Sequence, residues 1–189
     1  MELPRECIAT DVLVIGGGGA GARAALEAFR QGVNVHLVSK GQFGRSGVTA
    51  RRVSESAGFS AVDGCGGSES TIEAHFEDII ESGLGMANEQ LAQIVAEEAP
   101  QSLRYLEDLG VGFRKAGEKH QTRKACFCSH PRTHIITGQG VPIVRALAKE
   151  IERTKINIQS STAIVGLLVH HGSCQGAVGV DEDGKITVI

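Results

Sequence analysis

The most constraining feature of this sequence is a glycine-rich turn between an apolar segment and a small-residue helix. Residues 11–15 read DVLVI and are followed by GGGGAG and an alanine-rich segment. Gly16, Gly18 and Gly21 fit the spacing G-x-G-x-x-G, which permits a tight turn, close approach of backbone to a diphosphate, and close packing of helix on strand. Because free N–H groups and the positive end of a helix meet there, the turn predicts a site for nucleotide phosphates.

Around this turn the pattern predicts an α/β fold, a Rossmann-like domain with a parallel sheet. The continuous apolar run at 11–15 is typical of a strand buried on both faces. We expect a helix over 20–31, a second strand over 33–38, a helix over 143–153 and a third parallel strand over 156–159. Turn signals then separate three β-rich pieces that predict a small antiparallel meander, at 163–170, 175–180 and 186–189.

We interpret residues 1–189 as a single, incomplete domain with a long insertion over 40–140. Residues 40–68 are rich in glycine and serine and lack periodicity, and loops of this length inside a domain are usually functional or disordered. Residues 41–50 bring backbone N–H groups, hydroxyls and a guanidinium to the turn. They predict either a loop that wraps a diphosphate or an ordinary surface loop.

Within the insertion, apolar spacing predicts two helical regions. The first covers 70–82, with an apolar stripe formed by Ile72, Phe76, Ile79 and Ile80. The second begins after Asn88 and is expected to be interrupted at Pro100 before it resumes over 101–109. We expect its inward-facing residues to be Leu91, Ile94, Val95, Leu103, Leu106 and Leu109. Residues 112–137 are polar and basic and predict a solvated loop.

Composition limits the classes of function. The formal net charge of −3 gives no reason to expect binding to nucleic acid or membranes. Five cysteines without a C-x-x-C pair predict reduced thiols and a cytoplasmic protein. The Cys126-Phe-Cys128 pair with His130 has no second ligand pair, so we predict no metal site. No signal peptide or membrane-spanning segment is expected.

The end of the second strand leaves the nucleotide open. Dinucleotide folds usually place Asp or Glu there to accept a hydrogen bond from a ribose hydroxyl. This chain has Ser39 followed by Lys40. A serine can still contact a ribose, and the lysine adds positive charge, so NADP and other nucleotides remain possible on spacing alone.

Four segments together resemble the flavoprotein subunits of the succinate dehydrogenase/fumarate reductase family. These segments are DVLVIGGGGAGARAALEA, VNVHLVSKGQFGRSGVTA, HFEDIIESGLGMANEQLAQIVAEEAPQSLRYLEDLGV and SHPRTHIITGQGVPIVRALAKEI. The family includes L-aspartate oxidase and the adenylylsulfate reductase flavoprotein. The resemblance covers nearly the whole chain in order, and it implies the N-terminal FAD-binding part of a flavin-dependent oxidoreductase.

The resemblance implies FAD as the cofactor and assigns roles to fourteen residues. The diphosphate would be held by Gly16, Gly18, Gly19, Ala20 and Gly21. The ribose end would meet Ser39 and Lys40. The diphosphate and the isoalloxazine would lie along Arg45, Ser46, Gly47, Thr49 and Ala50. The adenine would lie near Ala163 and Ile164.

Two departures from the family pattern matter. Membrane-bound relatives attach flavin covalently to a histidine in an R-S-H-T segment, and this chain has Gly47 at that position, so we expect dissociable FAD. This suits fumarate reduction, aspartate oxidation or another acceptor better than succinate oxidation. The relatives' A-x-G-G stretch is also replaced, with Ala57-Gly58 as its counterpart. Two roles are open for His130 and Arg132 in the SHPR segment: contact with an anion or the flavin, or anchoring of the loop. His134 lies close by in the sequence and is considered with them.

Family members are much longer than this chain, so we assign no catalytic residue and expect this chain alone to be inactive. The absent parts imply a partner, either an iron–sulfur subunit or the remaining part of the flavoprotein. An unpaired edge at 11–15 also makes self-association plausible. A non-catalytic nucleotide-binding module and an NAD(P)-binding domain are the alternatives. The substrate stays open among fumarate, succinate, aspartate, adenylylsulfate and others.

Overall fold

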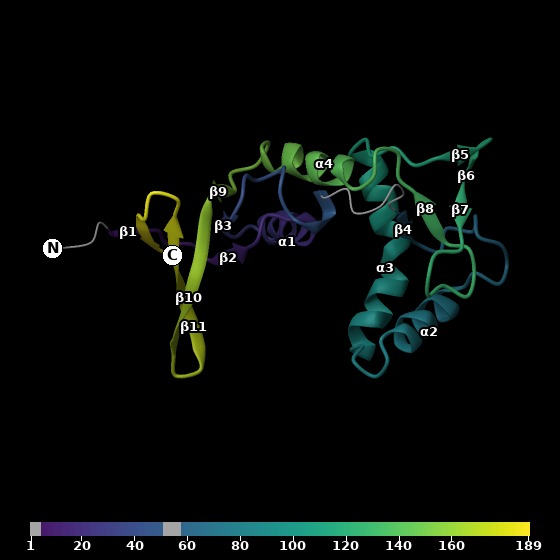
Figure 1. The fold of residues 1–189 in the computed structure, drawn as a ribbon, viewed down its shortest axis with the longest axis horizontal. Helices are drawn as coiled ribbons and strands as arrows, with labels where there is room; N and C mark the ends of the chain where they lie inside the picture. Colours follow the sequence, from purple (N-terminus) through teal and green to yellow (C-terminus); the bar gives the residue numbers. More distant parts are fainter. Residues whose placement is uncertain (1–4, 51–57) are drawn as a thin grey trace. The chain divides into compact units, whose positions relative to one another are not determined.

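The computed structural model describes residues 5–50 and 58–189, which fall into two compact units (Figure 1). The first unit comprises residues 1–51 and 143–189, and the second unit comprises residues 52–142. The chain therefore leaves the first unit at residue 51 and returns to it at residue 143, within a helix.

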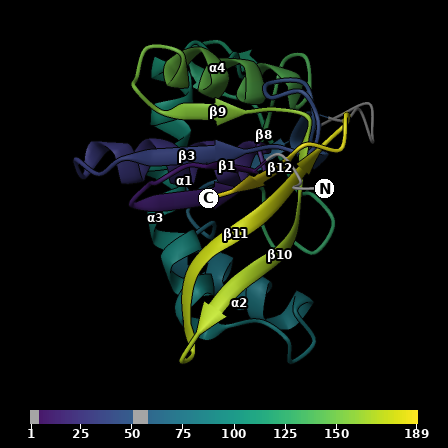
Figure 2. The same ribbon diagram turned by 90° about the vertical axis from the view of Figure 1, so that its left-hand side faces the viewer.

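A three-stranded parallel sheet forms the centre of the first unit. Its strands are β2 (Val12–Ile15), β3 (Val35–Val38) and β9 (Asn157–Gln159), in the order β2-β3-β9. Both pairings are parallel, as the sequence predicted, and Figure 2 shows β9 running beside β3. The helix α1 (Gly19–Arg30) packs against β2 and β3, and α4 (Val141–Ile151) leads into β9. This arrangement confirms the α/β class with a parallel sheet.

An antiparallel meander forms the second sheet of the same unit (Figure 2). It contains β10 (Thr162–His170), β11 (Ser173–Asp181) and β12 (Ile186–Val188), each antiparallel to the next. The meander was predicted, but the fourth strand of this sheet was not. β1 (Arg5–Cys7) lies parallel to β12 and completes the order β1-β12-β11-β10. A three-residue strand carries too short a pattern to stand out in a sequence.

Aliphatic side chains fill the core of the first unit. Every residue of β3 is buried, including His36, whose Nε2 lies 3.1 Å from Oε1 of Gln159. Further core residues come from α1 and α4, namely Ala22, Ala25, Leu26, Val144, Leu147, Ala148 and Ile151. Each fully buried leucine or isoleucine contributes about 1.5–3 kcal/mol relative to exposure, so these helices are fixed on the sheet mainly by apolar burial.

The second unit combines two helices with short strands. The helix α2 (Ile72–Ser82) is capped by Thr71, and α3 (Glu89–Asp108) is capped by Asn88, whose Oδ1 accepts from the Leu91 N–H at 3.0 Å. The strands of this unit are β4 (Gly58–Ser60), β5 (Lys115–Ala116), β6 (Lys119–His120), β7 (Thr122–Arg123) and β8 (Thr133–Ile135). A small antiparallel sheet has the order β4-β8-β7, and β5 pairs with β6 in a hairpin.

Helix α3 corrects two predictions. It continues through Pro100, where we expected an interruption. Leu91, Ile94 and Val95, which we expected to face inward, are exposed. The buried stripe is instead Ala92, Ala96, Ala99, Leu103 and Leu106. Because this stripe runs across the proline, packing on both sides offsets the roughly 3 kcal/mol that an interior proline costs.

Two further predictions for the second unit were wrong in detail. Residues 112–137 contain four short strands, although we expected a loop. In α2 the predicted apolar stripe is only half-buried, and the buried residues are His75 and Asp78. Both differences have one cause, because short strands and buried polar groups produce no apolar periodicity. Over residues 5–50 and 58–189, no helix is long and apolar enough to cross a membrane.

Candidate nucleotide-binding site

The turn after β2 has the geometry that its glycines predict. Gly16 has a φ of 111°, a conformation that favours glycine, and its N–H donates to the carbonyl of Val38 at 2.8 Å. A Cβ on Gly21 would lie 1.8 Å from the carbonyl oxygen of Gly16. No side chain fits there, so Gly21 lets α1 start directly against the turn. Two of the three motif glycines are thus explained by the backbone itself.

The N-terminus of α1 is open to an incoming anion. The N-cap residue is Gly18, and no side chain of the described residues caps the helix there. The first turn has no acidic residue, while Gly16 and Ala20 are exposed. The first N–H groups of a helix have no intrahelical acceptor, and the helix dipole adds about half a positive charge. The end of α1 therefore supplies N–H donors and positive potential to a diphosphate.

The loop at 45–50 folds onto this helix end. Gly47 has a φ of 96°, and a Cβ there would lie 3.0 Å from the Cα of Gly18. A Cβ on Gly19 would lie 2.9 Å from Oγ1 of Thr49, which lies in the 3₁₀ turn η1 (Val48–Ala50). Two segments that the sequence assigned to the same diphosphate therefore meet. Their glycines permit the contact between the backbones.

The polar side chains of this loop divide into two kinds. Arg45 is exposed, so its guanidinium is accessible from solvent. The hydroxyl of Ser46 donates to the carbonyl of Gln42 at 2.9 Å and so holds the loop in shape. The structure thus leaves the Arg45 side chain accessible from solvent, and it gives Ser46 a partner within the loop.

The residues predicted for the ribose and adenine end also lie together. Ser39 is buried: its N–H donates to the carbonyl of Gln159 at 2.8 Å, and its own carbonyl accepts from the Thr162 N–H at 3.1 Å. Ala163 and Ile164 follow Thr162 at the start of β10 and are half-buried. Lys40 is exposed. Ser39 thus joins the end of β3 to the start of β10.

Sequence reasoning missed two residues that shape this end. Gly17 is buried, and a Cβ there would lie 2.7 Å from Oγ of Ser39 and 2.8 Å from Cδ2 of Phe43. The N–H of Phe43 donates to Oγ of Ser160 at 3.2 Å. The run of four glycines was the available signal for Gly17. Ser160, distant in the sequence, gave none.

Arg132 and Asp78 form a buried ion pair in the second unit. The Arg132 side chain is fully buried and its Nη1 donates to Oδ2 of Asp78. The same carboxylate accepts from the N–H and hydroxyl of Ser129, at 2.7 and 3.1 Å. Burial alone would raise the pKa of Asp78, but these hydrogen bonds outweigh it and hold the pKa below its usual range. Of the two interpretations of Arg132, the structure supports loop anchoring.

The structure also shows the surroundings of His130, the cysteines and Gly58. His130 is half-exposed, with Nδ1 3.8 Å from the exposed carboxylate of Glu69. Cys126 and Cys128, like the other three cysteines, are free thiols. The counterpart of the A-x-G-G stretch begins outside the described residues, and Gly58 opens β4.

The turn, the open helix end and the loop folded onto it define a dinucleotide-binding α/β domain. The chain belongs to the FAD binding domain family, whose sequence profile matches residues 11–189. FAD is therefore the indicated cofactor. The residues present fit FAD: backbone N–H groups and an exposed arginine can donate to a diphosphate, and the glycines leave room for it.

Relatives agree with the resemblance to fumarate reductase and succinate dehydrogenase flavoproteins. One subunit of the fumarate reductase (CoM/CoB) of Methanothermobacter marburgensis is 34% identical over 184 residues, covering 93% of this chain and 31% of the relative. L-aspartate oxidase of Vibrio cholerae is 32% identical over 151 residues, covering 80% and 25%. The chain thus spans about a third or less of the length of these relatives.

Solved structures give the same picture of the fold. The Mycobacterium smegmatis Sdh1 complex matches with a TM-score of 0.84 and 29% identity, over 98% of this chain and 33% of that chain. Adenylylsulfate reductase of Archaeoglobus fulgidus matches with a TM-score of 0.78 and 26% identity, over 99% and 30%. The resemblance that the sequence segments suggested is confirmed at the level of the family.

Proposed function

We propose that this chain holds FAD for a flavin-dependent oxidoreductase of the fumarate reductase/succinate dehydrogenase type. The observation that carries the proposal is the contact of the loop at 45–50 with the open N-terminus of α1. Preorganised backbone donors at a helix end are well suited to a diphosphate. The bound FAD would supply a group that accepts or donates a hydride.

The proposal assigns each part of the site one task. The turn and first turn of α1 hold the diphosphate, Arg45 adds charge, and the loop lies along the diphosphate and flavin. Ser39, Lys40 and the start of β10 serve the ribose and adenine. The residues are Gly16, Gly18, Gly19, Ala20, Gly21, Ser39, Lys40, Arg45, Ser46, Gly47, Thr49, Ala50, Ala163 and Ile164.

Position 47 supports dissociable FAD. Gly47 has no side chain that could bond to the flavin, and its backbone lies close to the backbone of Gly18. A Cβ at 3.0 Å from the Gly18 Cα is tighter than ordinary contact, and the positive φ adds strain for any side chain. A histidine at this position would therefore disturb the close contact.

Activity and partners extend the same proposal to the whole protein. The names of its relatives favour fumarate or aspartate as substrate class, with electrons passing to an iron–sulfur subunit or another acceptor. The free cysteines suit a cytoplasmic location. We assign no catalytic residue to this chain, and we expect it to bind FAD without turning over a dicarboxylate. A flavin-binding domain into which residues 40–140 are inserted remains our description of its organisation.

A titration tests the cofactor. We expect purified chain to bind FAD with one-to-one stoichiometry, followed by flavin fluorescence, and to release all of it on acid precipitation. Flavin that stays with the precipitated protein would contradict the dissociable site. Preferential binding of NADP⁺, measured in competition with FAD, would contradict the choice of nucleotide.

Gly18→Ala tests the diphosphate site itself. Gly18 has an ordinary φ of −78°, and a Cβ there would approach only the Gly47 Cα, at 3.9 Å. The fold should therefore accept the methyl group, while the close approach of a diphosphate should not. We expect FAD to bind at least about tenfold more weakly, or roughly 1.4 kcal/mol.

Gly166→Ala is the matched control for that substitution. Its added Cβ would meet nothing within 4 Å, in strand β10. We expect unchanged FAD affinity for this variant. Equal affinities of Gly18→Ala and Gly166→Ala for FAD would place the diphosphate elsewhere.

A further inference from the structure

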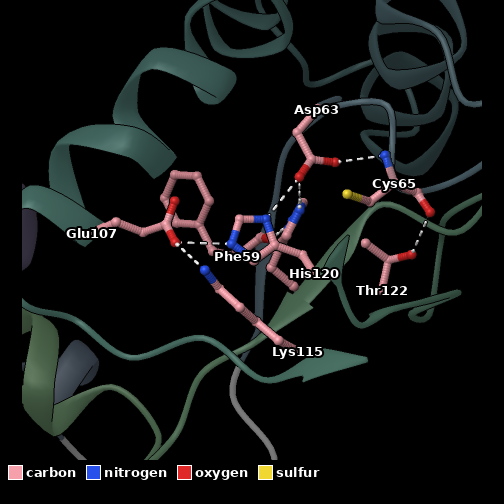
Figure 3. Close-up of polar contacts among 8 residues, drawn as sticks. Phe59, Asp63, Cys65, Glu107, Lys115, His120 and Thr122 are labelled. Carbon is pink, nitrogen blue, oxygen red and sulfur yellow. Dashed lines mark hydrogen bonds and ion pairs between the residues drawn. The ribbon is translucent and has the colours of Figure 1, made fainter. Parts of the chain in front are cut away.

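Three side chains with metal-binding atoms meet in the second unit, apart from the nucleotide site. Oδ2 of Asp63 lies 2.8 Å from Nδ1 of His120 (Figure 3). The same oxygen lies 2.9 Å from Nε2 of His134. All three ligand atoms lie within 4.8 Å of one another. Asp63 follows β4, His120 lies on β6 and His134 on β8, so three separate segments converge here.

His134 points an unsatisfied nitrogen at this cluster. Its side chain is completely buried, and its Nδ1 lies 3.1 Å from the carbonyl oxygen of Phe59. A carbonyl can only accept, so Nδ1 carries the hydrogen. In the neutral ring Nε2 then presents a lone pair towards the Asp63 carboxylate. Nε2 has no partner in hydrogen-bond geometry among the described residues. Two acceptors facing each other at 2.9 Å are favourable only with a proton or a metal ion between them.

The other two side chains are oriented in the same way. Nε2 of His120 lies 2.9 Å from Oε1 of Glu107, while its Nδ1 faces the cluster and lies within hydrogen-bond distance of Oδ2 of Asp63, at 2.8 Å (Figure 3). Oδ1 of Asp63 accepts from the Cys65 N–H at 2.9 Å, which leaves Oδ2. Histidine ligands of metals almost always donate their other N–H to a carboxylate or a backbone carbonyl. Both histidines are held from behind by such a partner, and Asp63 is held by a backbone N–H.

We propose that Asp63, His120 and His134 bind a divalent transition metal ion, with Zn²⁺ as the representative case. Two imidazole nitrogens and one carboxylate oxygen suit Zn²⁺ and similar ions better than Mg²⁺ or Ca²⁺, which prefer oxygen ligands. Tetrahedral zinc with bonds of about 2.1 Å needs ligand atoms roughly 3.4 Å apart. The Oδ2–nitrogen separations of 2.8 and 2.9 Å therefore have to widen by about half an ångström on binding.

Such an ion would serve the second unit as a structural crosslink. The strands that carry the two histidines are only two and three residues long, so they form few backbone hydrogen bonds. The fourth coordination position would be left to water, since Asp63 and His120 keep partial exposure. The site is independent of the proposed FAD site, all of whose residues belong to the first unit.

Zn²⁺ titration of the EDTA-treated full chain tests the proposal. We expect one Zn²⁺ per chain and a rise in the melting temperature. Three substitutions each remove one ligand atom and keep the atom that faces its supporting partner. His134→Asn keeps a donor to Phe59, His120→Gln keeps one to Glu107, and Asp63→Asn keeps an acceptor for Cys65. Each should weaken Zn²⁺ binding by at least about tenfold, since loss of a merely orienting residue costs roughly 10–100-fold.

Two controls cover the cysteines and the histidine of the segment at 126–130. Cys126→Ser combined with Cys128→Ser, and His130→Asn, should leave the affinity for Zn²⁺ unchanged, as should Gly18→Ala in the nucleotide site. No binding of Zn²⁺ at 100 μM (about the upper end of useful affinity for a dedicated site) overturns the proposal. So does full affinity in the three ligand variants.

A spectroscopic measurement on the unmodified chain keeps the test valid if a ligand variant fails to fold. X-ray absorption at the zinc edge should show only nitrogen and oxygen neighbours, with the scattering pattern of imidazole. Sulfur in the first coordination sphere would show that cysteines hold the ion and would overturn the proposal.

Discussion

Both units bury apolar side chains, but only the second buries a charged pair among the described residues. The first unit surrounds β3 with aliphatic side chains from α1 and α4. The second unit buries the charged pair of Asp78 and Arg132 and the polar His75 and His134. Apolar burial is tolerant of small changes, whereas a buried ion pair depends on both partners. The units should therefore fail for different reasons.

The chain contains a built-in means of following each unit. Its one tyrosine, Tyr105, lies on α3 in the second unit, and the chain has no tryptophan. Tyrosine fluorescence should therefore report on the second unit. Binding of FAD should report on the first. Each substitution below can be followed by both signals.

Asp78→Asn should have the largest effect. It leaves the fully buried Arg132 without a compensating charge, and breaking a buried pair from one side costs about 3–5 kcal/mol. We expect the tyrosine transition in urea to move to much lower concentration. FAD affinity, measured below the start of that transition, should change little. A loss of FAD affinity as large as the loss of stability would show that the units are not separable.

Gly21→Ala should have the next largest effect, in the first unit. Its Cβ would lie 1.8 Å from the Gly16 carbonyl oxygen, so the turn or the helix must move. Overpacking of this kind costs roughly 1–3 kcal/mol. We expect loss of FAD binding with an unchanged tyrosine transition, the reverse of Asp78→Asn. Full FAD binding by this variant would show that the turn adapts more readily than its geometry implies.

Acid should produce a smaller effect through the same ion pair. The pKa of Asp78 is lowered in the folded chain, so its contribution to stability is complete above the unfolded pKa, near 4, and is lost as the pH falls through the folded pKa. The stability difference between the unmodified chain and Asp78→Asn should therefore shrink below about pH 4. The protonated acid can still accept a hydrogen bond, so part of the difference should remain. A constant difference from pH 7 to pH 3 would exclude this ionisation as the cause.

The contrast between the units also explains which parts of the fold could be predicted. In the first unit the sequence signals were strong: an apolar run, a glycine turn and an alanine-rich helix. The parallel sheet and the meander followed from them. In the second unit, strands of two or three residues were too short to produce a pattern. The inward face of α3 was misread because alanines occupy it, and large aliphatic residues are exposed.

The candidate site was predictable to a similar extent. The motif located the helix end, and the resemblance located the loop at 45–50. The structure adds that Gly47 lies against Gly18 and that Ser39 is buried. The Asp63, His120 and His134 cluster could not be found in the sequence, because its members are distant and fit no metal motif. Such a cluster is created by the fold, whereas a glycine motif is local.

The interrupted sheet has a consequence for how the chain assembles. In the finished sheet, Val38 of β3 pairs in register with Gln159 of β9. The side chain of His36 also contacts that of Gln159, 123 positions later in the sequence. During synthesis, β3 must wait for the whole second unit to emerge before its outer neighbour arrives. Contacts of such long range form slowly and expose apolar strands in the meantime. We therefore expect β3 to remain open on that edge to association with other chains until β9 has been synthesised.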